Sequence, residues 1–147
     1  MLPALLNLWA DLRAAHHMYW TLHWQSRGPS FYGDHELFEG LYQAKAEQID
    51  GLAELIAASY GSDKLDPLAS WKAAAEKVEQ LSKISSPVQI AEMVVACAED
   101  VNVTVLADEE CPFPAGLSNY ISDLSTKNIK DLYMLKQRFG SAQGIGG

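Results

Sequence analysis

Apolar and aromatic side chains recur at steps of four and three residues in the first part of the chain. Such steps place side chains on one face of an α-helix, so the pattern predicts a helix from about Leu2 to Trp24. The stretch Arg27-Gly28-Pro29-Ser30 ends it, because glycine releases the backbone and proline cannot continue the hydrogen-bond ladder. The face is made up of Leu5, Trp9, Leu12, His16, Tyr19 and His23.

A second pattern of the same period runs from about Ser30 to Tyr60, and Gly61-Ser62-Asp63 closes it. At about 1.5 Å of rise per residue, a helix of this extent would be roughly 45 Å long. An ordinary globular helix is much shorter, so the length favours the spine of a helix bundle. The apolar side consists of Leu37, Leu41, Ile49, Leu52 and Ile56.

The rest of the chain predicts one short helix and two long ones. The short helix covers residues 66–72, with Asp66 as its cap and Pro67 in its first turn, and 83–87 is a break. A third long helix carries Ile90 to Val105, the proline-rich stretch 111–116 interrupts it, and a fourth runs from Leu117 to about Phe139. We therefore expect an all-α four-helix bundle with a short extra helix between its second and third long helices. Residues 1–140 would form a single domain and 141–147 a flexible C-terminal tail.

Composition indicates the class of protein and the compartment in which this bundle is expected. The chain has 147 residues, 48% of them hydrophobic and 20% charged, which suits one globular domain. No apolar run approaches the roughly 20 residues that cross a bilayer, and no signal peptide is visible. Two cysteines are too few for a disulfide framework, so we expect a cytoplasmic protein without a membrane partner.

The net charge of -8 bears on possible partners. An acidic surface repels phosphate backbones, and neither end of the chain carries a basic tail, so DNA binding is not expected. The same charge attracts cations, although acidity can equally serve solubility alone.

Potential metal ligands are concentrated in the first two predicted helices. Imidazole with carboxylate suits iron, zinc or manganese. His35 and Glu39 lie four residues apart, and so do Asp50 and Glu54, so each pair projects from one helical face. The candidate residues there are His16, His17, His23, His35, Glu36, Glu39, Glu47, Asp50 and Glu54.

The distance between the two pairs restricts how they can be used. Asp50 follows His35 by 15 positions, or about 22 Å of helix axis, whereas a metal centre spans only about 4 Å. Either the pairs serve different sites, or two copies of the chain lie antiparallel and bring one copy's His35 and Glu39 beside the other's Asp50 and Glu54. The usual di-iron bundle has Glu-x-x-His motifs on two helices, and this sequence has none, which disfavours a centre inside the bundle.

These residues resemble a known family. The stretch from Leu22 to Phe31 reads Leu-His-Trp-Gln-Ser-Arg-Gly-Pro-Ser-Phe, and Asp34-His35-Glu36-Leu37-Phe38-Glu39 and Asp50-Gly51-Leu52-Ala53-Glu54 follow. Together they look like the Dps (DNA protection during starvation) miniferritins of the ferritin-like superfamily. The family pattern has a His-Trp pair, Lys-Gly-Pro-x-Phe, a second histidine twelve residues after the first, an acid four further on, and Asp-x-x-x-Glu. Arg27 replaces the usual lysine, and the likeness is densest over residues 16–61.

The resemblance implies a homo-oligomer, a hollow shell of twelve ferritin-like subunits with ferroxidase sites at two-fold interfaces. His23 and His35 from one subunit, with Asp50 and Glu54 from its partner, would form the catalytic site, and Glu39 would be a further metal ligand or a supporting group. The family oxidises Fe²⁺ with hydrogen peroxide or oxygen and stores the ferric product, protecting against oxidative stress. Zinc is a possible substitute metal. In the family, acidic residues in this region line pores that admit iron. Asp108, Glu109 and Glu110 would take that place here.

Departures from the family pattern keep two rival readings open. Leu55 stands where an arginine often follows the ligand glutamate, and the loop before the last helix is short. The chain could therefore be a non-enzymatic shell with a degraded or zinc-occupied site. A protein that compacts nucleic acid is a third reading, which the charge argues against.

The other notable side chains have simpler interpretations. We expect His16 and His17 to be structural or on the surface, and the four tryptophans to be packing residues. Cys97 reads as a small core residue, and Cys111, in its loop, as an exposed one.

Overall fold

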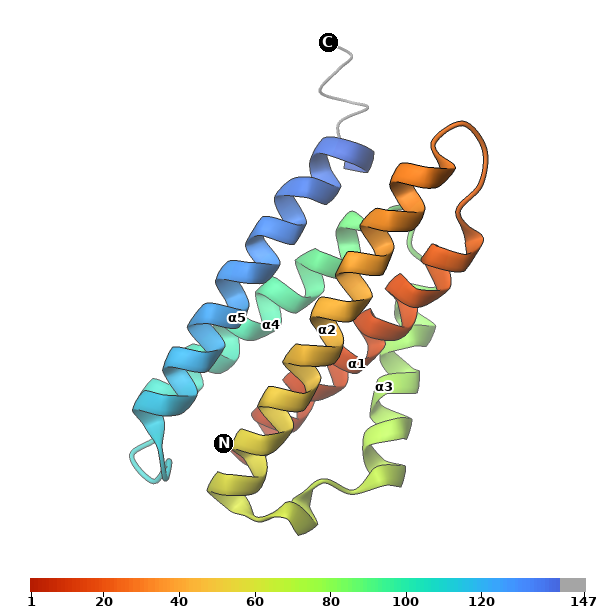
Figure 1. Cartoon of the computed structure of the whole chain (residues 1–147). Coiled ribbons are helices and arrows are strands. Elements are labelled where there is room, and N and C mark those ends of the chain that lie inside the picture. The colour runs from red at the N-terminus through yellow and green to blue at the C-terminus, as the bar shows by residue number, and fades with distance from the viewer. Residues whose placement is uncertain (141–147) are drawn as a thin grey trace.

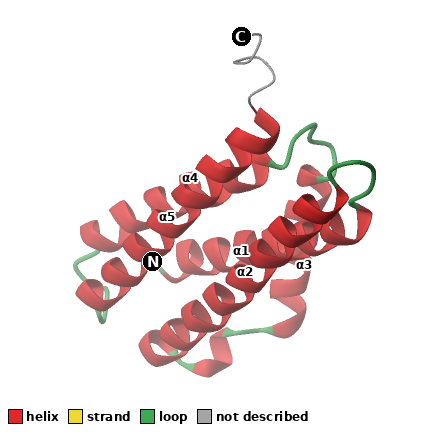
Figure 2. Ribbon diagram, turned by 45° about the horizontal axis from the view of Figure 1, so that its top comes forward, coloured by secondary structure: helices red, strands yellow, loops and turns green. Residues whose placement is uncertain are grey.

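Four long helices lie side by side, and a fifth packs against one side of them (Figures 1 and 2). The computed structural model describes residues 1–140, so the expected tail over 141–147 lies outside the described residues. Every regular element in the described part is helical, which confirms the predicted all-α class. The elements are α1 (Leu2–Gln25), α2 (Phe31–Tyr60), the short 3₁₀ turn η1 (Ser62–Lys64), α3 (Pro67–Leu81), α4 (Val88–Ala107), α5 (Pro114–Leu135) and the π-helical turn η2 (Lys136–Gly140).

The bounds of α1 and α2 agree with the prediction to within one residue, while α3 and α5 differ. The helix predicted over 66–72 continues to Leu81, because the alanine-rich segment that follows has strong helix propensity and packs on α1. The Asp66 carboxylate accepts a hydrogen bond from the Ala69 amide at 2.7 Å, as expected of the cap. Helix α5 begins at Pro114, before the predicted start at Leu117, because proline is well tolerated in a first helical turn.

The core lies between the pair α1 and α2 and the pair α4 and α5. Helix α1 supplies an almost fully buried row and packs against α2 and α4, as burial of one helical stripe requires. This row and its partners include Leu5, Leu8, Leu12, Tyr19, Leu52, Ile56, Ile90, Val94, Ala98, Leu117, Ile121 and Leu135.

The contact between α2 and α5 includes buried polar pairs. The Lys45 ammonium is fully buried and lies 2.8 Å from the Asp131 carboxylate. One turn along each helix, the Asn128 amide donates to Gln48 Oε1 at 3.0 Å. Burial lowers the pKa of Lys45, and the Asp131 carboxylate opposes that change. These pairs hold the two helices in one register, because any slip would leave buried polar groups without partners.

Helix α3 is attached to α1 through charged and aromatic contacts. Lys77 Nζ lies 3.2 Å from the buried Asp11 carboxylate. Arg13 donates to Ser70 Oγ at 2.8 Å, and its guanidinium lies 5.1 Å from the Trp9 ring centroid and 5.7 Å from that of Trp71. These contacts fix α3 on the outer side of α1.

The expectation that all four tryptophans pack inside is right only for Trp9. That ring is buried and its indole N–H donates to the Ile49 carbonyl oxygen at 3.1 Å. Trp20, Trp24 and Trp71 expose 39%, 61% and 63% of their surface in the single chain. They are exposed because they lie on the outer sides of α1 and α3, away from the contact with α4 and α5.

The expectation that Cys111 is exposed is wrong, whereas Cys97 packs against the core as expected but is only partly buried. Cys111 is 7% exposed, because the loop that carries it folds back on Tyr60, whose hydroxyl interacts with the thiol. Cys97 is only partly buried, and its sulfur accepts a long hydrogen bond of 3.5 Å from the Asn7 amide. Both thiols are free.

No helix within residues 1–140 is both long and apolar enough to cross a membrane.

The buried ion pair gives a stability prediction. Asp131→Ala leaves the Lys45 ammonium buried without its partner and should lower the free energy of unfolding by about 3–5 kcal/mol in urea denaturation. Lys127→Ala, which breaks the exposed pair with Asp123, should cost less than about 1 kcal/mol. Equal losses in the two variants would contradict a special role for the buried pair.

Candidate metal centre

Two histidines are brought together where α1 turns into α2. His23 lies near the end of α1 and His35 near the start of α2, and Gly28, with φ of 85°, supplies the left-handed residue of the turn between them. The imidazole rings stack with their centroids 3.6 Å apart and an interplanar angle of 20°. His23 is buried, and His35 is partly buried.

Each imidazole is held by the backbone of the other histidine. His23 Nδ1 lies 2.7 Å from the His35 carbonyl oxygen, and His35 Nδ1 lies 2.9 Å from the His23 carbonyl oxygen. Because a carbonyl oxygen only accepts, both Nδ1 atoms carry a proton and donate it. In the neutral tautomer this leaves the lone pair of each Nε2 free for a metal ion. A backbone hydrogen bond on the opposite ring nitrogen is the usual support of a metal-binding histidine.

Aromatic rings and an ion pair hold the turn itself. Phe31 stacks on His35 with a centroid separation of 4.9 Å, and the Tyr42 ring meets His23 at 5.3 Å. At the start of α2, Asp34 accepts a hydrogen bond of 2.7 Å from Arg138 Nε. The two imidazoles therefore belong to a well-supported structure formed by one chain.

The carboxylates of the predicted site lie elsewhere on the same helix. Asp50 and Glu54 are exposed on α2, and Glu39, one turn after His35, is partly buried. The ion pairs found in residues 1–140 involve none of these three carboxylates. They carry negative charge that no lysine or arginine of the described chain neutralises, which suits them to bind a cation.

A single chain does not complete a metal site. Helix α2 is continuous from Phe31 to Tyr60, so along its axis it keeps Asp50 about 22 Å and Glu54 about 28 Å from His35. Within residues 1–140, no three histidine, cysteine, aspartate or glutamate side chains are grouped closely enough to hold an ion. The structure unites His23 with His35 and leaves Asp50 and Glu54 as a separate pair, and their joint use of one metal remains a prediction.

Two residues beside the acidic pair were not predicted from the sequence. Tyr120 of α5 donates its hydroxyl to the Gln48 carbonyl oxygen at 3.1 Å, next to Gly51, which lies between Asp50 and Glu54. A glycine in the interior of a long helix is a recognisable signal of close packing. The sequence does not reveal which side chain uses the space.

The other positions named in the sequence analysis lie outside the two ligand pairs, and each has a local environment of its own. His16 is partly buried against the Trp20 ring, and burial lowers its pKa, whereas His17 is exposed. Leu55 is partly buried and packs on the core, so it carries no charge toward Glu54. Asp108 ends α4 and accepts a hydrogen bond from the Glu110 amide at 3.0 Å, which orders this acidic turn.

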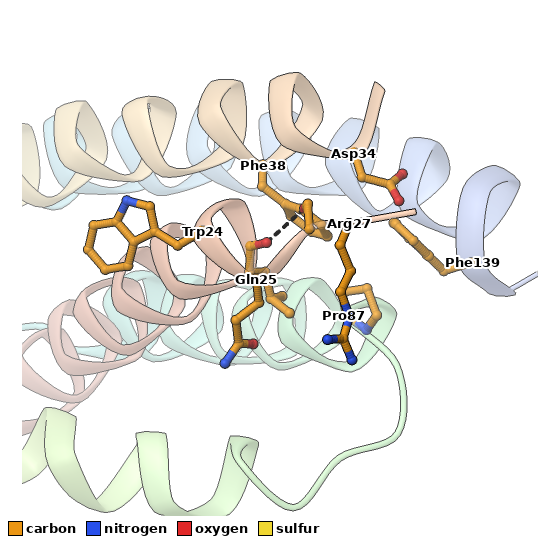
Figure 3. A pocket seen from close by; sticks show the side chains of 9 residues that line it. Trp24, Gln25, Arg27, Asp34, Phe38, Pro87 and Phe139 are labelled. Atoms are coloured by element: carbon orange, nitrogen blue, oxygen red, sulfur yellow. Dashed lines mark hydrogen bonds between the residues drawn. The ribbon is translucent and has the colours of Figure 1, made fainter. Parts of the chain in front are cut away.

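A cavity of about 680 Å³ lies at the end of the bundle near the histidine turn. Its walls come from the end of α1, the start of α2, Pro87 before α4, and Phe139 in η2 (Figure 3). None of the five predicted metal ligands lines it. The cavity is therefore separate from the candidate centre.

Comparison with known proteins places this fold. The model of the ferritin-like domain family matches residues 3–106, and the chain belongs to that family. A search of curated protein sequences finds no match.

Two solved structures of Dps proteins have the same fold. The Dps protein of Vibrio cholerae O1, described as a member of a broad superfamily of ferritin-like diiron-carboxylate proteins, is similar with a TM-score of 0.67 and 21% identity, over 92% of this chain and 86% of that one. Dps from Thermosynechococcus elongatus has a TM-score of 0.64 and 25% identity, over 92% and 87% of the two chains. The likeness confirms the ferritin-like four-helix bundle with an extra helix in the connection between the second and third long helices.

His35 has two roles: its Nδ1 bonds to the His23 backbone, and its Nε2 is the candidate metal ligand. We predict that a substitution can remove the second role and keep the first. In His35→Asn the side-chain amide can still donate to the His23 carbonyl, while the Nε2 ligand is lost. His35→Ala removes both and should cost about 1–3 kcal/mol of stability. Thermal unfolding and Zn²⁺ titration of both variants measure this. We expect both variants to bind Zn²⁺ more weakly than wild type, and His35→Asn to be more stable than His35→Ala. Identical unfolding midpoints of the two variants would contradict the role of the Nδ1 hydrogen bond.

Proposed function

We propose that this protein is a cytoplasmic iron-binding and iron-storing miniferritin. Its subunits would assemble as a homo-oligomer, a shell of twelve, and oxidise Fe²⁺ with hydrogen peroxide or oxygen at sites shared by two subunits. The observation that carries the proposal is the pair of imidazoles with both Nε2 atoms free, together with unpaired carboxylates on the same helix. Membership of the ferritin-like family and the Dps fold support it, and the two free thiols suit a reducing compartment.

The donor set suits the oxidation of iron. His23 and His35 bind Fe²⁺ without adding charge, and the carboxylates of Asp50, Glu54 and Glu39 are hard oxygen donors that stabilise the Fe³⁺ product. Each Fe²⁺ gives up one electron, so two ferrous ions supply the two electrons that reduce one hydrogen peroxide to water. Two irons reacting together avoid the one-electron step that would release hydroxyl radical.

The arrangement of α2 explains why two subunits would be needed. If two copies of α2 pack antiparallel with His35 of one beside Asp50 of the other, the same two-fold axis gives a second, equivalent site. The axis would then pass near the middle of the helix, between the two pairs. The exposed Trp20 and Trp24, which continue the surface around His23, are the kind of aromatic side chains that such interfaces bury.

The sharing of the site can be tested by mixing inactive subunits. His35→Ala lacks the histidine half and Asp50→Ala lacks the acidic half, so each homo-oligomer should lose rapid ferric absorbance after aerobic Fe²⁺ addition. In a mixed two-fold pair, one site carries both defects and the other carries none. Random co-assembly should therefore restore activity to about a quarter of all sites.

The control for this mixing experiment is co-assembly of His23→Ala with His35→Ala subunits, which damages every site. If the first mixture stays as inactive as this control, the site is not shared. If the wild-type protein binds zinc and oxidises no iron, the shell has a storage or structural role without catalysis.

The acidic turn after α4 gives a separate prediction on iron entry. If Asp108, Glu109 and Glu110 line a pore, their field attracts ferrous ions. Changing them to Asn, Gln and Gln should slow iron uptake by about tenfold at low ionic strength, and less in high salt. Stopped-flow uptake by the assembled shell measures this. Unchanged rates of iron uptake would show that this acidic turn is not on the route by which iron enters.

A further inference from the structure

The turn of α2 that carries Asp50 and Glu54 is in unusually close contact with α5. A Cβ atom built on Gly51 would meet the Tyr120 hydroxyl oxygen and lie 2.9 Å from Tyr120 Cζ and 3.1 Å from Cε2. Real Cβ atoms do not approach ring atoms so closely. Gly51 is therefore required for the phenol of Tyr120 to lie against the helix backbone.

The phenol uses this space to bond to the helix. Its hydroxyl donates to the Gln48 carbonyl oxygen at 3.1 Å. In an α-helix that carbonyl also accepts from the amide four residues later, at Leu52, so the bond from Tyr120 uses its second lone pair. Tyr120 thus fixes the carbonyl at the start of the turn that presents Asp50 and Glu54.

Burial and neighbouring charges both act on this hydroxyl. Burial raises the pKa of Tyr120, Lys127 opposes this, and the carboxylates of Asp123, Asp50 and Glu54 raise the pKa further. The hydroxyl is therefore protonated at neutral pH and available as a donor. The polar α2–α5 contact continues from this point through Gln48 and Asn128 to Lys45 and Asp131.

We propose that Tyr120 is a positioning residue for the acidic half of the metal centre, acting through the Gln48 carbonyl in the slot that Gly51 leaves open. This inference rests on the proposed function, because it assigns Asp50 and Glu54 to metal binding. Tyr120 stiffens the turn, so both carboxylates face the partner subunit in one orientation before the metal arrives. Supporting groups of this kind typically change metal affinity by about 10–100-fold when they are removed.

The test compares metal affinity with stability in the assembled protein. Tyr120→Phe keeps the ring and removes the hydrogen bond, and it should weaken Co²⁺ binding about tenfold and shift the visible absorption of bound Co²⁺. Hydrogen exchange at the Leu52 amide should become faster. Ile121→Val is the matched control, since it removes one buried methyl group from the same helix without touching Gln48. It should lower the unfolding midpoint and leave Co²⁺ affinity unchanged.

A double-mutant cycle tests the role of Gly51. Gly51→Ala alone should displace the phenol and weaken Co²⁺ binding at least as much as Tyr120→Phe does. In a Tyr120→Ala background the same glycine substitution should have no further effect, because the ring it would displace is gone. Additive losses would overturn the proposed slot.

The outcomes separate this inference from the function on which it rests. If wild type binds no Co²⁺, or if His35→Asn binds it equally well, the shared metal centre fails and this inference fails with it. If His35→Asn abolishes binding and Tyr120→Phe binds Co²⁺ as wild type does, only the role of Tyr120 is overturned. Parallel losses of affinity in Tyr120→Phe and Ile121→Val would reduce Tyr120 to a general contribution to stability.

Discussion

The unbroken course of α2 is the constraint on which the rest of the structure depends. Its 30 residues form one continuous helix, with His35 near one end and Asp50 and Glu54 near the other. A straight helix cannot fold its own ligands together, so any centre that uses both groups must take one of them from another chain. The turn that pairs His23 with His35 holds the start of this helix, and the polar contact with α5 holds its middle.

The two halves of the candidate centre are built in different ways. The histidine half is complete within one subunit, because each imidazole is bonded to the backbone of the other histidine. Asp50 and Glu54 of the acidic half are exposed, and beside them Tyr120 of α5 bonds to the backbone of α2 at Gln48. A subunit can therefore hold its imidazoles in place on its own, whereas under the proposed function its carboxylates would share a metal with imidazoles only after assembly. Metal binding and assembly should consequently stabilise one another.

Much of this arrangement was predictable from the sequence, because it depends on local periodicity. The steps of three and four gave the bounds of α1 and α2, and the spacing of His35 from Asp50 already excluded a centre within one straight helix. The outer positions of Trp20, Trp24 and Trp71 were not predicted, because periodicity cannot separate a ring that packs inside from one on the outer side of its helix. The burial of Cys111 and the contact of Tyr120 with Gly51 depend on residues distant in sequence, which a helical pattern does not connect.

The Lys45–Asp131 pair affects where a cation can bind in the folded subunit. The bundle interior already contains a fixed cation, the Lys45 ammonium, bonded to the carboxylate that would otherwise attract one. A divalent ion entering there would be repelled by a like charge in a medium of low dielectric constant. The ion pair therefore disfavours a second cation between α2 and α5, where the carboxylate already has its partner. The lysine is an internal counter-ion for Asp131, so the two charges compensate one another inside the bundle.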